Sequence, residues 1–502
     1  MAAPTEIPAG TSTTSPPTEF IRGIGPLAAI SLVVGSMIGS GIFIVPADIG
    51  RQVAPWGPGA LLLVWVITGA MTVTGALSYA ELAAMMPRAG GQYVFLREGL
   101  SPVAGFLYGW TLFAVIQTGT IAAVAVAFAK FLSVLVPAVS PDVFLPLGQV
   151  RMPGAAEAIQ LGLSPQRVVA ILMIAVLTGT NMLGVTLGAA IQTVFSVVKF
   201  GALAALVLLG LTLFRQPDVA ATNFSNFWGT GDWSLAVVPA IGAAMVGSLF
   251  SSDAWNNVTF AAAEVQHPSR NLPRALAIGT GTVCLLYVLA NIAYLNVLPF
   301  AGDPHGGDVL ARGLQYAAQD RVGTAAVEVV LGSAAAAVMA VAILLSTFGC
   351  NNGLILSGPR VYYAMARDRL FFQRAGSLHP TWRTPVFGLV AQAIWASVLC
   401  VSGTYGQLLD YVIFAALVFY FLTTIALFRL RRTRPDLPRP VRAFGYPVLP
   451  ALYLVAVGAL MLILLFAKPL YTWPGLLIVA SGVPVYLLWR RSDTPRGPVT
   501  SA

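Results

Sequence analysis

Apolar stretches of about twenty residues recur along the chain, separated by short polar segments, and each is long enough to cross a bilayer as a helix. A single membrane domain over residues 21–491 is therefore expected, in an all-α integral membrane protein. Twelve spans are predicted, beginning near Ile24, Gly59, Pro102, Val168, Ile191, Leu235, Ala275, Val327, Pro385, Gln407, Pro447 and Leu470.

The first apolar stretch, VVGSMIGSGIFIVPADIG, carries Gly35, Gly39 and Gly41 near the middle of its predicted helix. Glycine weakens a helix, so this concentration needs a physical reason. Gly35 and Gly39 form a GxxxG pattern, which by itself favours close packing of helices. The sixth span indicates another reason, because polar residues interrupt it at a similar depth: Ser251, Ser252, Asp253 and Asn256.

Two interrupted helices five spans apart are typical of transporters built from inverted repeats. Unpaired backbone inside a membrane is tolerated only where it lines a protected or water-filled cavity. We predict two five-helix repeats, over about residues 24–214 and 235–430, with a site at their interface, followed by two helices over about 447–490. Half-helix N-termini suit a carboxylate and half-helix C-termini suit an ammonium group, so the predicted ligand is an amino acid.

Composition agrees with this class, because 57% of the 502 residues are hydrophobic and 9% are charged, against roughly 25% charged in soluble domains. The formal net charge is +9; nineteen arginines fall on the predicted side of the termini and seven basic residues on the other. This asymmetry predicts cytoplasmic termini in a multi-pass protein of the cell membrane. Such an asymmetry reflects membrane topology and contact with anionic lipid headgroups, so no nucleic-acid partner is expected.

The two ends of the chain lack strong apolar patterning. Residues 1–20, rich in Ala, Pro, Ser and Thr, predict a disordered cytoplasmic tail without a signal peptide, and residues 492–502 predict a second cytoplasmic tail.

No catalytic, metal or cofactor site is expected. Cys284, Cys350 and Cys400 fall in predicted spans at unrelated spacings, and the three histidines fall in loops. A membrane-embedded enzyme would need converging nucleophiles or ligands at membrane depth. A channel would need a repeated filter sequence or rings of charge. Neither pattern is present, so both classes stay open only as alternatives to a transporter.

Two charged residues lie within predicted spans, at positions where the cost of burying the charge must be offset by a polar or charged partner. Lys199 is near the middle of the fifth span, where a lysine costs at least about 2.5 to 3.5 kcal/mol, and we expect it to tie helices together or to titrate. Asp253 could hydrogen-bond the broken helix, carry a proton or face a basic substrate; we favour the first. Glu81, Glu264 and Asp410 lie at predicted span ends, where a solvated carboxylate is expected.

Four motifs then occur in order along the chain: GSMIGSGIF, SYAELAAMMPRAGGQYVFLREG, EVQHPSRNLPRA and STFGCNNGLILSGPRVYYAMARD. In these motifs the sequence resembles the L-type amino-acid transporter branch of the amino acid-polyamine-organocation superfamily, from about Phe20 to Arg429. The resemblance implies the leucine-transporter fold, with five plus five inverted helices, interrupted first and sixth helices, and alternating access by movement of a bundle against a scaffold.

The resemblance also implies a binding site at the two helix breaks. Around Gly39, the backbone N–H groups of Ser40, Gly41 and Ile42 would hold the substrate carboxylate. The carbonyl groups that would hold the amino group belong to Met37, Phe250 and Asp253.

Aromatic and basic side chains have family roles as well. Phe250 and Trp255 would act as gating or pocket-wall residues. Lys199 matches a lysine that takes the place of a sodium ion in related carriers and links the first helix to the eighth near Ser346 or Thr347. This match implies sodium-independent transport.

The sixth-helix motif departs from the usual F-A-Y-G-G-W and reads FSSDAW. Ser252 replaces the aromatic residue, Asp253 the first glycine and Ala254 the second. Substrate preference is therefore expected to depend on this segment and its neighbours Ser251 and Asn256.

Heteromeric relatives carry a cysteine between the third and fourth spans that links them to a glycoprotein subunit. The segment from Pro137 to Gln166 has none, so no disulfide-linked heavy subunit is expected. The function predicted from these features is secondary transport of L-amino acids by alternating access, sodium-independent and by exchange. The alternative is a proton-coupled carrier of cationic amino acids or polyamines, with Asp253 as counter-ion or proton site.

Overall fold

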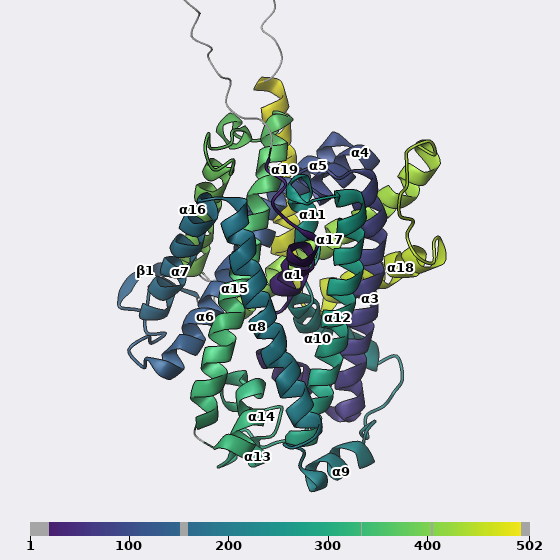
Figure 1. The fold of residues 1–502 in the computed structure, drawn as a ribbon. Coiled ribbons are helices and arrows are strands. Elements are labelled where there is room, and N and C mark those ends of the chain that lie inside the picture. Colours follow the sequence, from purple (N-terminus) through teal and green to yellow (C-terminus); the bar gives the residue numbers. More distant parts are fainter. Residues whose placement is uncertain (1–19, 151–158, 333, 403–404, 493–502) are drawn as a thin grey trace, which may run out of the picture.

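The computed structural model describes residues 20–150, 159–332, 334–402 and 405–492, which form a bundle of helices (Figure 1). Within these residues, ten helices are long and apolar enough to span a membrane. The sixth and ninth predicted spans are shorter apolar helices, α10 and α16. The all-α membrane class is confirmed, whereas the count of twelve spans stays a prediction. The predicted tails lie almost wholly outside the described residues.

The elements before the second helix break are α1 (Pro26–Met37), α2 (Gly41–Gln52), α3 (Gly57–Met85), α4 (Gln92–Gly99), α5 (Pro102–Thr111), α6 (Gln117–Leu135), β1 (Leu145–Val150), β2 (Ile159–Leu163), α7 (Pro165–Met182), α8 (Val185–Leu211), α9 (Pro217–Ser225) and α10 (Val237–Ser251). Those after it are α11 (Asn257–Phe260), α12 (Pro268–Val297), α13 (Val309–Arg312), α14 (Val322–Leu331), α15 (Ala334–Arg367), α16 (Val386–Ser402), α17 (Tyr405–Thr433), α18 (Val448–Ala467) and α19 (Pro469–Ser492).

Local sequence explains where several of these helices begin. α5 and α7 each start with proline after a serine, and the hydroxyl groups of Ser101 and Ser164 accept backbone N–H groups in the first turn. Proline suits the first helical position because it has no N–H to leave unpaired. Gly184, with a φ of 133°, separates α7 from α8, which the apolar pattern alone could not divide.

The first span is the most enclosed part of the bundle. Its apolar window is 89% buried, against 28% for α18 and 22% for the last span. α1 packs against α8, α12 and α15, while α2 packs against α10 (Figure 1). The two helix breaks therefore lie inside the protein, shielded from lipid by other helices.

Three features were absent from the predicted pattern. An antiparallel hairpin, β1–β2, joins the third and fourth spans. A π-helical turn, Leu112–Ile116, joins α5 to α6. The eighth span was expected to begin near Val327, but α14 ends at Leu331, and Gly332, with a φ of 59°, follows it before α15 starts.

Backbone pairing joins the segment before α1 to the segment after α11. The Ile24 N–H donates to the Glu264 carbonyl at 2.9 Å, and the Gln266 N–H donates to the Ile24 carbonyl at 2.9 Å. These bonds form an isolated parallel bridge between Ile24 and Val265. The segment before the first break is thus paired with the segment after the second break at one end of the bundle.

Two carboxylates expected to be solvated are buried instead. Glu264 is 1% exposed and is bonded through both oxygens by Arg360 of α15, at 2.7 and 3.1 Å. Glu81 is fully buried and is bonded by Arg431 of α17 at 2.9 and 2.5 Å. The expectation was wrong because arginines distant in sequence reach these span ends and replace water as partners. The side chain of Asp410 lies outside the described residues.

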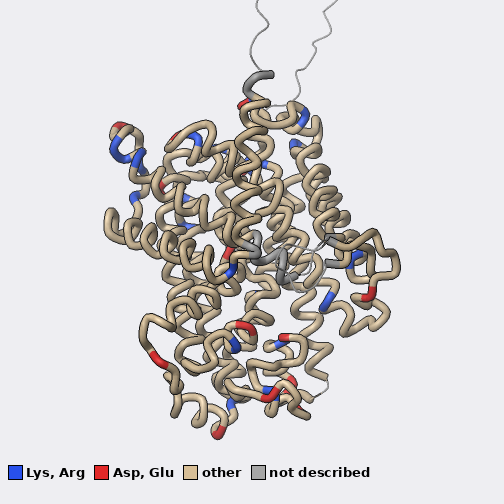
Figure 2. The backbone as a smooth tube through the Cα atoms, turned by 180° about the vertical axis from the view of Figure 1, so that it is seen from behind, with Lys and Arg blue, Asp and Glu red and all other residues tan. Residues whose placement is uncertain are grey.

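Basic residues are unevenly distributed along the bundle axis. Figure 2 shows many blue positions toward the upper end and over the loop that joins α17 to α18, whereas acidic and basic positions are mixed at the lower end. This distribution is consistent with a preferred orientation in a membrane.

Candidate functional site

The first helix break lies between α1 and α2. α1 ends at Met37, Ile38 is extended with a φ of −73° and a ψ of 97°, and α2 begins at Gly41 after Ser40. An α-helix leaves its last carbonyls and its first N–H groups without intrahelical partners. The break therefore places a set of carbonyl groups and a set of N–H groups next to each other inside the protein.

Side chains from α8 and α15 bind the carbonyl groups of this break. The Lys199 ammonium donates to the Gly35 carbonyl, to the Ile38 carbonyl at 2.8 Å and to the Ser346 carbonyl at 3.3 Å. The Ser346 hydroxyl donates to the carbonyls of Ile38 and Gly39, each at 3.2 Å. These hydrogen bonds bring Lys199 of α8 and Ser346 of α15 together at the first break.

Thr347 takes a different position. Its hydroxyl donates to Ile343 and Leu344 carbonyls of its own helix, at 2.8 and 3.1 Å. Ser346 therefore hydrogen-bonds to the first break, whereas the Thr347 hydroxyl bonds within its own helix.

The second break lies between α10 and α11. α10 ends at Ser251, and the chain through Ser252–Asn256 is non-helical before α11 begins at Asn257. Ala254 has a φ of 65°, a left-handed conformation that costs an L-residue about 1–2 kcal/mol. The family pattern given above has its second glycine at this position, and glycine would adopt this conformation without that cost.

The two breaks meet closely. A Cβ atom built on Gly41 would lie 2.2 Å from the Ser251 hydroxyl oxygen and 3.1 Å from the Ser251 Cα. Only glycine allows α2 to begin this near the end of α10. Gly35 has a packing role, since a Cβ there would lie 2.0 Å from Gln192 of α8.

Tyr287 of α12 joins the two breaks and was not identified from the sequence. Its hydroxyl donates to the Met37 carbonyl at 3.0 Å and lies 3.1 Å from the Ser251 carbonyl. The side chain is 1% exposed and packs edge-on against Trp65. A tyrosine in the middle of an apolar span was the available signal, because a buried hydroxyl usually has a polar partner.

Asp253 points toward α17. Its carboxylate accepts a hydrogen bond from the Tyr420 hydroxyl, and Tyr420 stacks on Trp255 with ring centroids 5.3 Å apart. Tyr79 of α3 completes this aromatic group, at 4.8 Å from Trp255 and 6.0 Å from Tyr420. A carboxylate at membrane depth is thus held among aromatic rings by one hydroxyl group.

Two small cavities border this group. One, of about 20 Å³, is lined by residues that include Ser252, Asp253 and Trp255, and the other, of about 10 Å³, by Asp253, Ala254 and Asn256. These volumes are the size of one water molecule. The site is therefore closed in this conformation, with no room for an amino-acid side chain.

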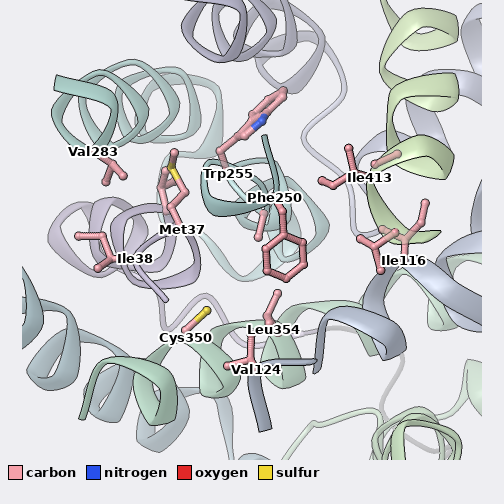
Figure 3. Close-up of a cluster of buried hydrophobic side chains, with 14 of the residues drawn as sticks. Met37, Ile38, Ile116, Val124, Phe250, Trp255, Val283, Cys350, Leu354 and Ile413 are labelled. Atoms are coloured by element: carbon pink, nitrogen blue, oxygen red, sulfur yellow. The ribbon is translucent and has the colours of Figure 1, made fainter. Parts of the chain in front are cut away.

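Phe250 and Asn256 lie on opposite sides of the second break. Figure 3 shows the Phe250 ring pointing away from α10 toward Leu354, close to Val124, where it fills the centre of the bundle. The Asn256 amide donates to Gln92 of α4 at 2.8 Å. Phe250 thus packs into the apolar interior beside the breaks, while Asn256 fixes the start of α11 to a neighbouring helix.

The described residues contain no group of three or more His, Cys, Asp or Glu side chains that could hold a metal ion. The polar groups described at the two breaks are mainly backbone N–H and carbonyl groups and the side chains that bind them. Two interrupted helices that meet in the interior of a helical membrane bundle are the arrangement of a secondary transporter.

Comparison with known proteins gives a narrower assignment. The chain belongs to the amino acid permease family, whose sequence profile matches residues 24–488. It is 28% identical over 492 residues to the b(0,+)-type amino acid transporter 1 of Rattus norvegicus, which covers 95% of this chain and 90% of the relative. It is 30% identical over 481 residues to the large neutral amino acids transporter small subunit 2 of Homo sapiens, covering 93% and 80%.

These relatives confirm the resemblance to the L-type transporter branch. The protein is accordingly a multi-pass membrane protein of an amino acid transporter family, and general amino acid transport is its function.

Proposed function

We propose that the protein carries L-amino acids across the cell membrane by sodium-independent exchange, with the substrate bound between the two helix breaks. The observation that supports this most directly is the juxtaposition of the breaks, with Gly41 beside Ser251 and the Tyr287 hydroxyl between Met37 and Ser251 carbonyls. Backbone N–H and carbonyl groups of the two breaks would then face one small volume.

In this proposal the α2 N-terminus binds the substrate carboxylate through the N–H groups of Ser40, Gly41 and Ile42. The partial positive charge of a helix N-terminus favours an anion at this position. The amino group would bind carbonyls of Met37, Phe250 and Asp253, at the C-terminal ends of α1 and α10. A carbonyl has two lone pairs, so the Met37 carbonyl can accept from Tyr287 and from a substrate.

Sodium independence is supported by the position of Lys199. Its ammonium group lies among three carbonyl oxygens, from Gly35, Ile38 and Ser346. Unwound backbone carbonyls of this kind bind sodium in related transporter architectures. A side-chain ammonium group there would supply the charge that a bound sodium ion otherwise brings.

Side-chain selectivity would come from the second break. Ser252, Asp253 and Trp255 line one of the two small cavities, and Asp253 and Asn256 line the other. Because these cavities hold about one water each, a substrate side chain must enlarge them. We infer that Phe250 and the segment around Ala254 move when substrate enters.

A second candidate function is a proton-coupled carrier of cationic amino acids or polyamines. The buried carboxylate of Asp253, which accepts one hydrogen bond from Tyr420 and borders both cavities, favours it. Such a carboxylate could pair with a substrate cation or take up a proton.

Orientation and assembly are also proposals. We place both termini in the cytoplasm, with inverted repeats over about residues 24–214 and 235–430. The three cysteines are buried, so none offers an exposed thiol for a disulfide-linked heavy subunit, and we propose that the chain works without one.

Transport in liposomes tests the proposal. Purified protein is reconstituted into vesicles preloaded with one unlabelled amino acid, and uptake of labelled L-amino acids is measured with and without sodium. We expect uptake that requires internal amino acid and is unchanged when sodium is replaced by choline. Uptake into empty vesicles driven by a proton gradient would instead support the second candidate, and strict sodium dependence would contradict the first.

A further inference from the structure

A basic cavity lies at the end of the bundle where α1 and α12 begin, away from the helix breaks. It has a volume of about 380 Å³, far larger than the cavities of about 20 and 10 Å³ beside Asp253. Its polar side is formed by His267, Arg270 and Arg274, and its apolar side includes Ile30 and Ile278. None of its lining residues is acidic.

The two arginines of this cavity have no partner among the residues that the structure describes. Over the residues that the structure describes, neither the Arg270 nor the Arg274 guanidinium makes a hydrogen bond or an ion pair, and both side chains are exposed. They are four residues apart on α12, so they project from the same face of the helix, one turn above the other. Two positive charges therefore face one cavity, and no described residue neutralises either of them.

The same helix face becomes apolar immediately beyond Arg274. Ile278 is 51% exposed and Leu285 is 62% exposed, and both continue the row that begins with Arg270. On the α1 side, Leu27 is 64% exposed beside the lining residue Ile30. A ligand that fits this surface needs an anionic end and a long apolar part.

Helix length places the cavity at the membrane surface. α12 has 30 residues, or about 45 Å of helix, against a hydrocarbon core about 30 Å thick. Because Arg270 and Arg274 lie in its first two turns, we place the start of α12 in the headgroup layer and the row from Ile278 onward at the depth of the acyl chains.

We propose that this cavity binds an anionic phospholipid, with its headgroup phosphate between Arg270 and Arg274 and its acyl chains along Ile278 and Leu285. Basic pockets between transmembrane helices suit such headgroups. A free inorganic anion would use the arginines but leave the apolar row unexplained. Because α1 and α12 pack together, the lipid bridges the first half-helix and its neighbour. The proposal is independent of which substrate is carried.

Native mass spectrometry of the purified full-length chain tests this site. Phosphatidylglycerol and phosphatidylcholine of the same acyl composition are added in equal amounts, and the bound population of each is measured. We expect preferential binding of phosphatidylglycerol, weakened about 30-fold by Arg270→Gln with Arg274→Gln, since each surface arginine contributes about 1 kcal/mol toward anionic lipid. The matched control, Arg432→Gln with Arg442→Gln, removes the same charge elsewhere and should change binding by less than about threefold.

Two further arms separate the alternatives. Ile30→Trp fills the cavity without changing charge and should also reduce phosphatidylglycerol binding severalfold, which covers the case in which the double arginine variant does not fold. Inorganic phosphate at millimolar concentration should not displace the lipid. Binding unchanged in both cavity variants, an equal loss in the control variant, or displacement by phosphate alone would each overturn the assignment.

Discussion

The two helix breaks lie against each other but are held in different ways. Around the first break, side chains from α8 and α15 bind the exposed carbonyls, with Lys199 and Ser346 together contacting Gly35, Ile38 and Gly39. Around the second break, the main polar group is the Asp253 carboxylate, which accepts from Tyr420 beside two small cavities.

In the proposed site, this difference would separate two tasks. The first break is fixed by an ammonium group and hydroxyl groups, so it would bind the parts that all amino acids share. The second break contains a strained residue, Ala254, and borders the two small cavities. It is suited to distinguish one side chain from another and to change shape on binding.

The most damaging change to the first break should be Gly41→Leu. Its side chain would overlap Ser251 and occupy the proposed carboxylate position, so we expect uptake in liposomes to fall at least about 100-fold. Gly201→Leu is the matched control, because a Cβ on Gly201 would meet nothing within 4 Å. Normal uptake by the Gly41 variant would refute the assigned carboxylate site.

Lys199→Ala should have the next largest effect. It leaves carbonyls of Gly35, Ile38 and Ser346 without their cation, and hydrogen bonds to charged groups are worth about 1.5–3 kcal/mol each. We expect transport to fall about tenfold or more with substrate binding partly retained, measured by flux and by equilibrium binding. Lys130→Ala, which removes the other lysine predicted within a span, should be nearly neutral; equal effects would show that Lys199 has no special role.

Asp253 separates the two candidate functions. Asp253→Asn can still accept from Tyr420, so uptake of neutral amino acids should stay within about threefold of wild type, whereas Asp253→Ala leaves that hydroxyl without its acceptor and should lose about tenfold. Competition by arginine and by leucine is measured for both variants. A loss confined to arginine in the Asn variant would favour the carrier of cationic amino acids.

The smallest effect is expected from Ala254→Gly. Removing the Cβ relieves a left-handed conformation, so the protein should gain about 1 kcal/mol of stability, seen as a higher unfolding temperature in detergent. Ala205→Gly, within α8, should instead lose about 0.5–1 kcal/mol. The same sign in both variants would mean that the second break stores no strain.

The membrane-spanning helices could be predicted from the sequence, because the length of an apolar stretch decides whether it can cross a bilayer. Glycines in the first span and polar residues in the sixth indicated both breaks, and Lys199 stood out because a central lysine needs compensation. Periodicity carries no information about partners distant in sequence. Burial of Glu81 and Glu264 depends on Arg431 and Arg360, 350 and 96 residues away, so it could not be foreseen.

The role of Tyr287 was missed for a related reason. An isolated tyrosine in an apolar span is ordinary, and only the meeting of two breaks gives its hydroxyl two carbonyl groups to contact. Ser346 and Thr347 are adjacent in sequence, yet helical geometry directs one toward the break and lets the other bond within its own helix. Neighbouring positions in a motif therefore did not share a role.

The bridge between Ile24 and Val265 gives the closed conformation a built-in reporter. Its two hydrogen bonds, from the Ile24 and Gln266 amides, join the ends of both broken helices, so α1 cannot swing outward without exposing both protons to solvent. Hydrogen–deuterium exchange at these two amides would then measure how often the protein opens at this end, before any substrate is added. Exchange at this one backbone pairing would thereby report the rate of opening in the absence of substrate.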